Sequence, residues 1–114
     1  MRRLFLFLAL AVGISACQIS TKPLPFQVSM TLSKTAGAPG DTIGVLVTAQ
    51  GGRILNIQCD FADGDPLAFP TGGARTAQAL FPHVYNTAGN YTVTVTVTDG
   101  NEGDKVLTNV VHIQ

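Results

Sequence analysis

The sequence has little charge, no tryptophan and almost no cysteine, and each shortage narrows the classes of protein that it can encode. The chain of 114 residues has two cysteines, and 12% of its residues are charged, with a formal net charge of zero. Nucleic-acid-binding domains need a basic face, so the balanced charge excludes nucleic acid as a partner. Because one cysteine has a separate role, described below, no disulfide is expected and the core must hold by aliphatic packing.

Catalytic motifs are missing as well. The sequence has no glycine-rich phosphate loop, no H-E-x-x-H zinc motif and no G-x-S-x-G nucleophile motif. Neither His83 nor His112 has a catalytic or metal-binding context. A nucleophile pair of Cys59 and His83 is disfavoured, because Cys59 is expected to face inward without a basic neighbour to lower its thiol pKa. We therefore expect no enzyme, and no small-molecule substrate is indicated.

The N-terminus has the form of an export signal. Met1–Arg3 is basic, Leu4–Ile14 is an uninterrupted apolar run, and Ser15-Ala16 offers the small residues that a signal peptidase needs. A helix of eleven residues spans about 16 Å, which is too short for a bilayer core of about 30 Å. Residues 1–16 are therefore predicted to be a signal peptide.

The end of this segment, Ile14-Ser15-Ala16-Cys17, resembles the lipobox of bacterial lipoproteins. The resemblance implies a diacylglycerol on the Cys17 thiol, further acylation such as palmitate, and cleavage that leaves Cys17 as the first residue. Two or three acyl chains hold a protein firmly, since each buried methylene adds about 0.8 kcal/mol. Gln18 in place of Asp resembles the outer-membrane address of Gram-negative lipoproteins. The alternative is an ordinary secretory signal that happens to precede a cysteine.

The rest of the chain divides into a lipidated tether, residues 17–25, and a folded domain, residues 26–114. The tether is polar and contains proline. The clearest strand of the domain is Asn90–Asp99, where Tyr91 and three valines alternate with four threonines. Such alternation of β-branched residues predicts a strand with one buried face and one wet face.

Further strands are predicted by the same alternation between glycine- and proline-rich turns. They are expected at Phe26–Leu32, Thr42–Ala49, Leu55–Phe61 and Val106–Ile113, with a weak strand at Thr76–Phe81. Turns are expected at Lys34–Asp41, Gln50–Gly52 and Gly100–Asp104, with a corner at Pro82–Gly89 and the least regular segment at Ala62–Gly73. Short strands separated by turns indicate an antiparallel β-sandwich.

Two segments carry motifs. The first is C-D-F-A-D-G at Cys59–Gly64. The second lies within His83–Asp99 and consists of H-V-Y at its start and G-N-Y-T-V-T-V-T-V-T-D at its end. They resemble the W-D-F-G-D-G and H-x-Y…G-x-Y-T-V-x-L-x-V-x-D patterns of the polycystic kidney disease (PKD) repeat family. The resemblance implies an all-β, immunoglobulin-like sandwich of about seven strands, usually an extracellular spacer or binding module. Cys59 stands where the family has tryptophan. Ala62 stands where it has glycine, and must accept the backbone angle of the turn.

Two groups of oxygen-bearing side chains are candidates for Ca²⁺. Asp60, Asp63 and Asp65 form one group, and Asp99–Asp104 contains the other. Some PKD-like domains bind calcium, but neither group has EF-hand spacing. The alternative is that these Asp-Gly pairs are turn formers, whose carboxylates bond their own backbone. We favour the turns and expect no cofactor.

The function expected from these features is that of a non-catalytic lipoprotein on the cell envelope, on the outer membrane in a Gram-negative cell. Its domain would contact protein or glycan, or serve a structural role. The alternative is an accessory subunit or inhibitor of a secreted enzyme, acting through the Ala62–Phe81 loop; a hydrolase is the least favoured class. Glycan contact uses exposed aromatics, for which Phe69 and Phe81 are the candidates.

Overall fold

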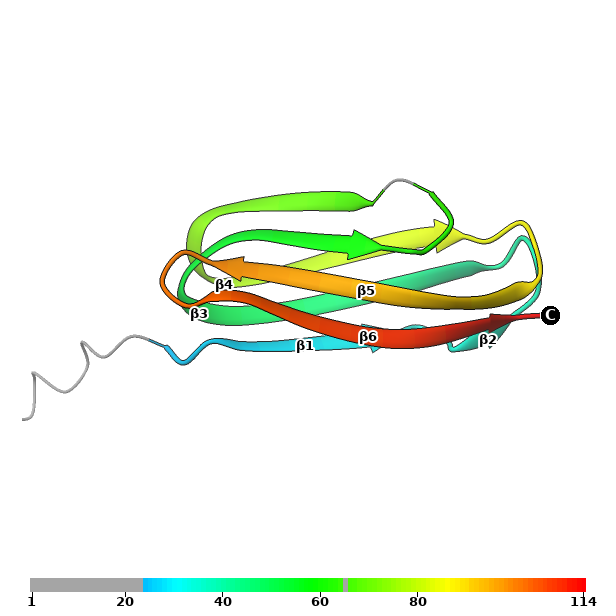
Figure 1. The fold of residues 1–114 in the computed structure, drawn as a ribbon, viewed down its shortest axis with the longest axis horizontal. Coiled ribbons are helices and arrows are strands. Elements are labelled where there is room, and N and C mark those ends of the chain that lie inside the picture. The colour runs from blue at the N-terminus through cyan, green and yellow to red at the C-terminus, as the bar shows by residue number, and fades with distance from the viewer. Residues whose placement is uncertain (1–23, 65) are drawn as a thin grey trace, which may run out of the picture.

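The structure is a computed structural model that describes residues 24–64 and 66–114. The predicted signal peptide, Cys17 and Asp65 lie outside the described residues. The described chain is all-β, as predicted. Its strands are β1 (Gln27–Leu32), β2 (Ala36–Gly37), β3 (Thr42–Asp60), β4 (Leu67–Val84), β5 (Gly89–Asp99) and β6 (Gly103–Ile113) (Figure 1). Within these residues, no helix is long and apolar enough to cross a membrane.

Two long strands, β3 and β4, each contribute to both layers of a sandwich. The first half of β3, Thr42–Gln50, pairs with β1 on one side and with Thr76–Val84 of β4 on the other. The second half of β3, Ile54–Asp60, pairs with β5 and with the beginning of β4. β6 continues the second layer beside β5, and β2 adds to β6 in parallel. The first sheet is therefore β1-β3-β4, and the second is β4-β3-β5-β6-β2.

The predicted turn at Gln50–Gly52 is wrong, because β3 runs through this segment as a bent strand. The register shifts between Gln50 and Ile54, which lets the strand pass from one sheet to the other. A side chain on Gly51 would overlap the buried Asp99 carboxylate, so glycine allows the close approach of these two segments. Bulges of this kind bend a strand and change which face its side chains occupy.

The predicted Ala62–Phe81 loop is also wrong, because most of this segment is strand β4. Gly72 and Gly73 have φ angles of 64° and 88°, and at this bend β4 passes between the sheets. Of the described residues of this segment, only residues 62–64 and Pro66 lie outside a strand. An accessory protein could not use this segment as a flexible loop, since it is paired along β3.

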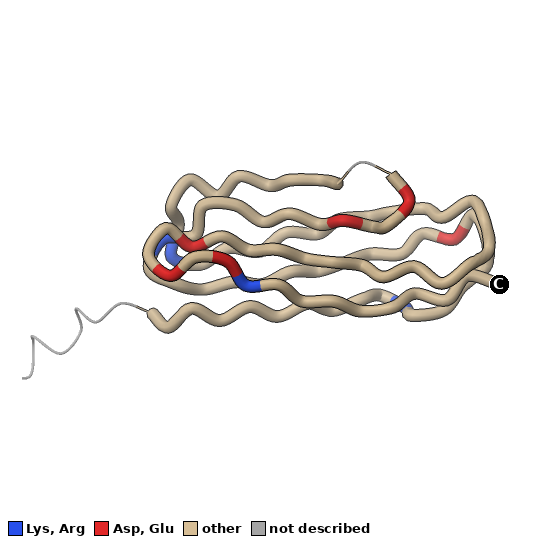
Figure 2. The backbone as a smooth tube through the Cα atoms, viewed as in Figure 1, with Lys and Arg blue, Asp and Glu red and all other residues tan. Residues whose placement is uncertain are grey.

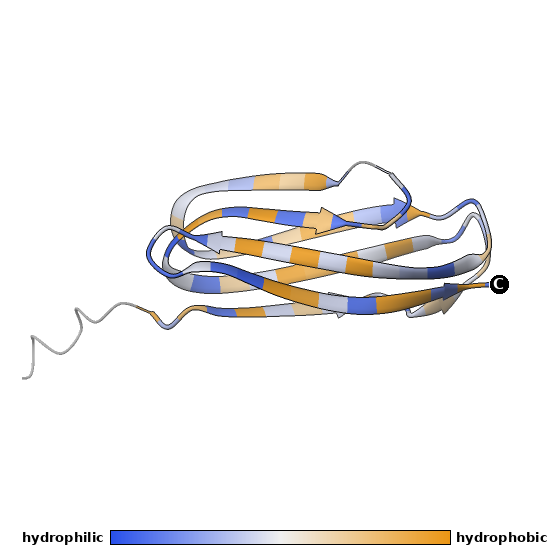
Figure 3. Cartoon of the chain, in the orientation of Figure 1, coloured by the Kyte–Doolittle hydropathy of each residue, from blue (hydrophilic) through white to orange (hydrophobic). Residues whose placement is uncertain are grey.

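The core lies between the two sheets and has the alternation that the sequence predicts. Val93, Val95 and Val97 of β5 are fully buried, while the threonines that alternate with them are exposed or half-buried. Figure 3 shows the corresponding alternation of apolar and more polar residues along β5. Burying a valine fully is worth about 1.5–3 kcal/mol, so β5 supplies a large share of the packing. The opposite sheet contributes Ile43, Val45 and Val47.

Candidate functional site

Of the first acidic group, the structure describes Asp60, the last residue of β3, and Asp63, in the connection that follows. Asp60 Oδ1 accepts a hydrogen bond from Ala62 N at 2.9 Å, and Ala62 has a φ of 69°. Asp63 Oδ2 is hydrogen-bonded to His83 Nε2 at 2.8 Å. Among the described residues, no group of three or more His, Cys, Asp or Glu side chains is placed to hold a metal ion.

Four rings pack in a row, one from the connection after β3, one from β4, one from just after β4 and one from β5. Phe61 and His83 lie parallel with centroids 4.1 Å apart, and His83 meets the edge of Tyr85 at 4.6 Å. Tyr85 stacks on Tyr91 at 4.1 Å. The Tyr85 hydroxyl is buried and donates to the Phe61 carbonyl at 2.9 Å, and burial raises the pKa of Tyr85 above its ordinary value. His83 therefore has a structural role, because its ring packs between Phe61 and Tyr85 and its Nε2 bonds Asp63.

Tyr91 makes a bond of the kind found in the tyrosine corner of immunoglobulin domains. Its hydroxyl donates to the Thr87 carbonyl at 2.7 Å, four residues back along the chain. The bond fixes the corner before β5.

The second acidic group contains a carboxylate with a structural role. Asp99 is 2% exposed and accepts bonds from four backbone N–H groups. Asn101 and Glu102 donate to its Oδ1, while Gly52 and Arg53 donate to its Oδ2. The bond from Asn101 is the largest cause of a lowered pKa of Asp99, and the other three N–H groups lower it further. Asp99 thus holds the turn between β5 and β6 against the bend of β3.

Cys59 faces the core, as predicted. Its side chain is fully buried, and burial together with the nearby Asp60 charge raises the pKa of its thiol to about 12. His83 Nε2 faces Asp63 rather than this thiol. Cys59 is therefore a protonated core residue and not a nucleophile.

Of the two candidate surface aromatics, one is placed as expected. Phe69 is 44% exposed, whereas Phe81 is 5% exposed and packs in the core. The expectation for Phe81 is wrong, because its register partner is the buried Val45 and both point inward. One exposed phenylalanine does not make a row of rings for glycan stacking.

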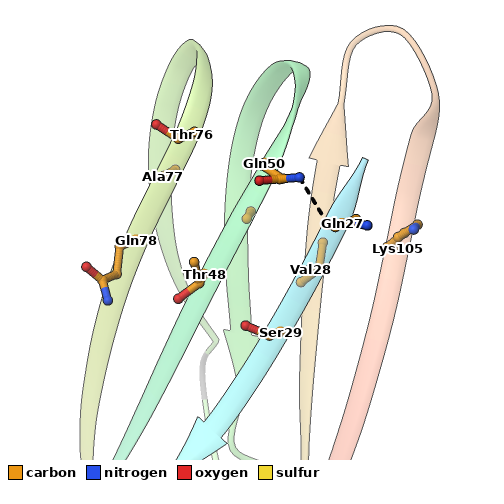
Figure 4. A pocket seen from close by; sticks show the side chains of 10 residues that line it. Gln27, Val28, Ser29, Thr48, Gln50, Thr76, Ala77, Gln78 and Lys105 are labelled. Atoms are coloured by element: carbon orange, nitrogen blue, oxygen red, sulfur yellow. Dashed lines mark hydrogen bonds between the residues drawn. The ribbon is translucent and has the colours of Figure 1, made fainter. Parts of the chain in front are cut away.

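A groove of about 770 Å³ runs along the first sheet near the start of β1 (Figure 4). Its polar lining is Gln27, Ser29, Thr48, Gln50, Thr76, Gln78 and Lys105. These side chains offer amides, hydroxyls and one ammonium. Gln50 Nε2 donates to Gln27 Oε1 at 3.0 Å across the strand pair.

Lys105 forms the border of the groove and holds the N-terminal end of the domain. Its Nζ donates to the Phe26 carbonyl at 2.5 Å and lies 5.1 Å from the centre of the Phe26 ring. Charged residues are unevenly distributed over the domain. Lys, Arg, Asp and Glu lie mainly toward its two ends (Figure 2). The first-sheet segments Gln27–Leu32, Thr42–Gln50 and Thr76–Val84 contain no Lys, Arg, Asp or Glu, so Lys105 of β6 is the one charged residue in the lining of the groove.

Sequence reasoning missed the groove. Its residues are the polar positions of three alternating strands, which the sequence shows one strand at a time. Ser29, Thr48 and Gln78 form one row because β1, β3 and β4 pair in this register. The one sequence feature that could have indicated the groove is the absence of charged residues at the outward positions of β1, β3 and β4 that line it.

Comparison with known proteins agrees with the sandwich and its motifs. The PKD domain family matches residues 25–111. The chain belongs to the PKD domain family. PKD domains are generally non-catalytic modules and typically occur in extracellular or exported proteins. No protein of curated function matches the sequence.

Solved structures share the fold at low sequence identity. A PKD domain of an M14-like peptidase from a Thermoplasmatales archaeon has a TM-score of 0.62 and 19% identity, over 80% of this chain and 94% of that one. The PKD domain of the human VPS10 domain-containing receptor SorCS2 has a TM-score of 0.52 and 24% identity, over 82% and 76%. A CARDB domain from Pyrococcus furiosus, solved with di-metal ions, has a TM-score of 0.58 and 15% identity, over 80% and 93%. These similarities show the fold alone.

Proposed function

We propose that this PKD protein is an exported, non-catalytic lipoprotein, anchored to the bacterial cell envelope through acyl chains on Cys17. In a Gram-negative cell the anchor lies in the outer membrane. The domain displays its groove to another envelope protein. The lipobox-like residues Ile14–Cys17 support the anchor, and membership of a family of non-catalytic modules supports the contact role.

The groove is the observation that carries the contact role. It is open and uncharged apart from Lys105. Its lining combines amide and hydroxyl groups in rows along three strands with the apolar Val28, Ala49 and Ala77. Protein interfaces combine such neutral hydrogen-bonding groups with well-packed apolar surface. Glycan sites in contrast use aromatic faces, and the groove has none among its lining residues. Protein is therefore the favoured partner over glycan.

The position of the groove fits a contact close to the membrane. Gln27, at the start of β1, lines the groove and lies ten residues after Cys17. A fully extended chain of ten residues spans at most about 36 Å. A Cys17 anchor would therefore hold the groove near the bilayer, where it would meet membrane-bound or membrane-adjacent proteins.

Site-specific photo-crosslinking tests the contact role. A photoreactive residue at Ser29, inside the groove, is compared with one at Thr108, which is exposed on the second sheet. We expect a discrete crosslinked species from position 29 in intact cells and none from position 108. Equal crosslinking at both positions, or none at either, contradicts the proposed groove. Cys17→Ser in the same experiment should reduce the yield, because the unanchored chain leaves the membrane.

A second candidate function is that of an accessory subunit or inhibitor of a secreted enzyme. It is favoured by the similarity to a PKD domain that belongs to a peptidase. Since the Ala62–Phe81 segment is strand β4, such a contact would use a strand surface and not a loop. Co-purification of a hydrolase activity with the wild-type chain, lost on Gln78→Lys in the groove, would favour this function.

A further inference from the structure

Strand β4 has an unpaired edge in the first sheet. Thr76–Val84 pairs with Thr42–Gln50 of β3 in one unbroken register. Within residues 24–64 and 66–114, β4 pairs with no other strand. Its second side therefore presents backbone groups to solvent.

The register shows which backbone groups face that side. Ser33 N donates to the Gly44 carbonyl, and Gly44 N donates to Ser33 Oγ, each at 2.8 Å. Both main-chain groups of Gly44 thus point toward β1, so Gly44 and its partner Pro82 form a non-hydrogen-bonded pair. Because the pattern alternates, Thr76, Gln78 and Leu80 direct both N–H and C=O to the open edge.

This edge has none of the charged side chains that usually prevent self-association. No charged side chain occurs from Thr76 to Phe81. Leu80, on the outer face, is 65% exposed, which makes it the most exposed of the large hydrophobic residues described. Natural sheets protect their edges with charges, prolines or bulges, and an uncharged exposed edge readily pairs with another strand. Here a proline, Pro82, and the Gly72-Gly73 bend limit the free edge at its two ends.

We propose that two copies of this chain pair antiparallel through this edge, with a two-fold axis at Gln78. Gln78 then lies opposite Gln78 of the second copy, and Thr76 lies opposite Leu80 in both directions. All three positions present N–H and C=O toward the partner, so the pairing forms about six backbone hydrogen bonds. The edge is self-complementary because these outward groups are symmetric about Gln78.

The pairing joins two first sheets into one, in the order β1-β3-β4-β4-β3-β1. Thr76 and Gln78 line the groove of each copy, so the two grooves become adjacent across the axis. Gln27 pairs with Gln50, and Gln50 pairs with Thr76, so the N-terminal end of each copy lies only two register positions from the axis. The two N-terminal ends lie on opposite outer edges of the joined sheet, because β1 is the outermost strand of each copy. If Cys17 is the anchor, both anchors enter one bilayer when the joined sheet lies along the membrane. This last consequence rests on the proposed function; the pairing itself does not.

Sedimentation of the detergent-purified full chain tests the proposal. We expect the wild-type chain to be a dimer and Gln78→Lys to be a monomer, because it places two like charges directly opposite each other. Thr92→Lys, an exposed charge on the second sheet, is the matched control and should remain dimeric. Gln78→Pro, which removes only an outward N–H, should also weaken the dimer while leaving the β3–β4 hydrogen bonds intact.

A mixing experiment tests the two-fold axis itself. Gln78→Lys and Gln78→Glu chains with different tags should each be monomeric alone and should form a mixed dimer together. A monomeric wild-type chain overturns the proposal. A dimer that survives both Gln78→Lys and Gln78→Pro also overturns the proposal. If the Gln78→Lys and Gln78→Glu chains fail to associate with each other, pairing at Gln78 is overturned.

Discussion

The buried hydroxyl of Tyr85 provides the most quantitative test of how the motif residues hold this fold. Tyr85→Phe removes one oxygen and keeps the ring between His83 and Tyr91. In the wild type that oxygen donates to the carbonyl of Phe61, itself 2% exposed, at 2.9 Å. The variant leaves this carbonyl without its partner at the end of β3.

The magnitude follows from the burial of both groups. A buried acceptor that loses its partner costs about 1–3 kcal/mol of unfolding free energy. For a domain of this size, 1 kcal/mol corresponds to about 4–8 °C in melting temperature. Tyr85→Phe should therefore melt at least about 4 °C below the wild type.

Tyr91→Phe is the matched control. Its hydroxyl also donates to a backbone carbonyl, that of Thr87, but the bond is exposed, so water can replace it. We expect a loss of about 1 kcal/mol or less. The assay is urea unfolding followed by circular dichroism, with equal m-values for all three proteins. Equal destabilisation by the two variants, or a Tyr85→Phe protein as stable as the wild type, would refute this account of the ring stack.

Three further predictions concern titration and metal binding. The lowered pKa of Asp99 means that the stability from its four N–H bonds is present above pH about 4 and is lost as the pH falls below that value. In urea titrations, the free energy of unfolding of Asp99→Asn should therefore depend less on pH in the acid range than that of the wild type. The Cys59 thiol keeps its proton to about pH 12 in the folded state but ionises near pH 9 when unfolded, so the free energy of unfolding should fall as the pH rises above 9, and should fall less in Cys59→Ala. A thiol reagent should label Cys59 of the wild type only on unfolding. We expect no change in melting temperature between millimolar Ca²⁺ and chelator; saturation at 100 times the Kd would add about 2.7 kcal/mol, and such a gain lost on Asp63→Asn would establish a calcium site instead.

Much of the fold could be predicted from local patterns. The valines and threonines of β5 alternate without interruption, and one face is indeed the core. Cys59 faces the core, as its place in an alternating strand implied, and Ala62 adopts the positive φ that its glycine-like position implied. These features depend on residues within a few positions of one another, which is why a sequence shows them.

The remaining features depend on contacts between distant segments. Gly51 and Gly52 are compatible with either a turn or a bulge, and the bulge forms beside Asp99, 47 residues after Gly52. Part of the predicted turn Lys34–Asp41 is instead the short strand β2. This strand forms because its two residues pair in parallel with β6, which lies far along the chain. The groove and the free edge of β4 follow from the register of three strands. Alternation predicts each strand's two faces but not its neighbours.

Mass spectrometry of the mature N-terminus tests the central claim most directly. The claim is that Cys17 carries the lipid anchor that holds this PKD domain at the envelope. We expect a chain that begins at Cys17 with the added mass of a diacylglycerol and further acyl groups, and Cys17→Ser should lack this species. An unmodified N-terminus, or cleavage at another position, would contradict the claim.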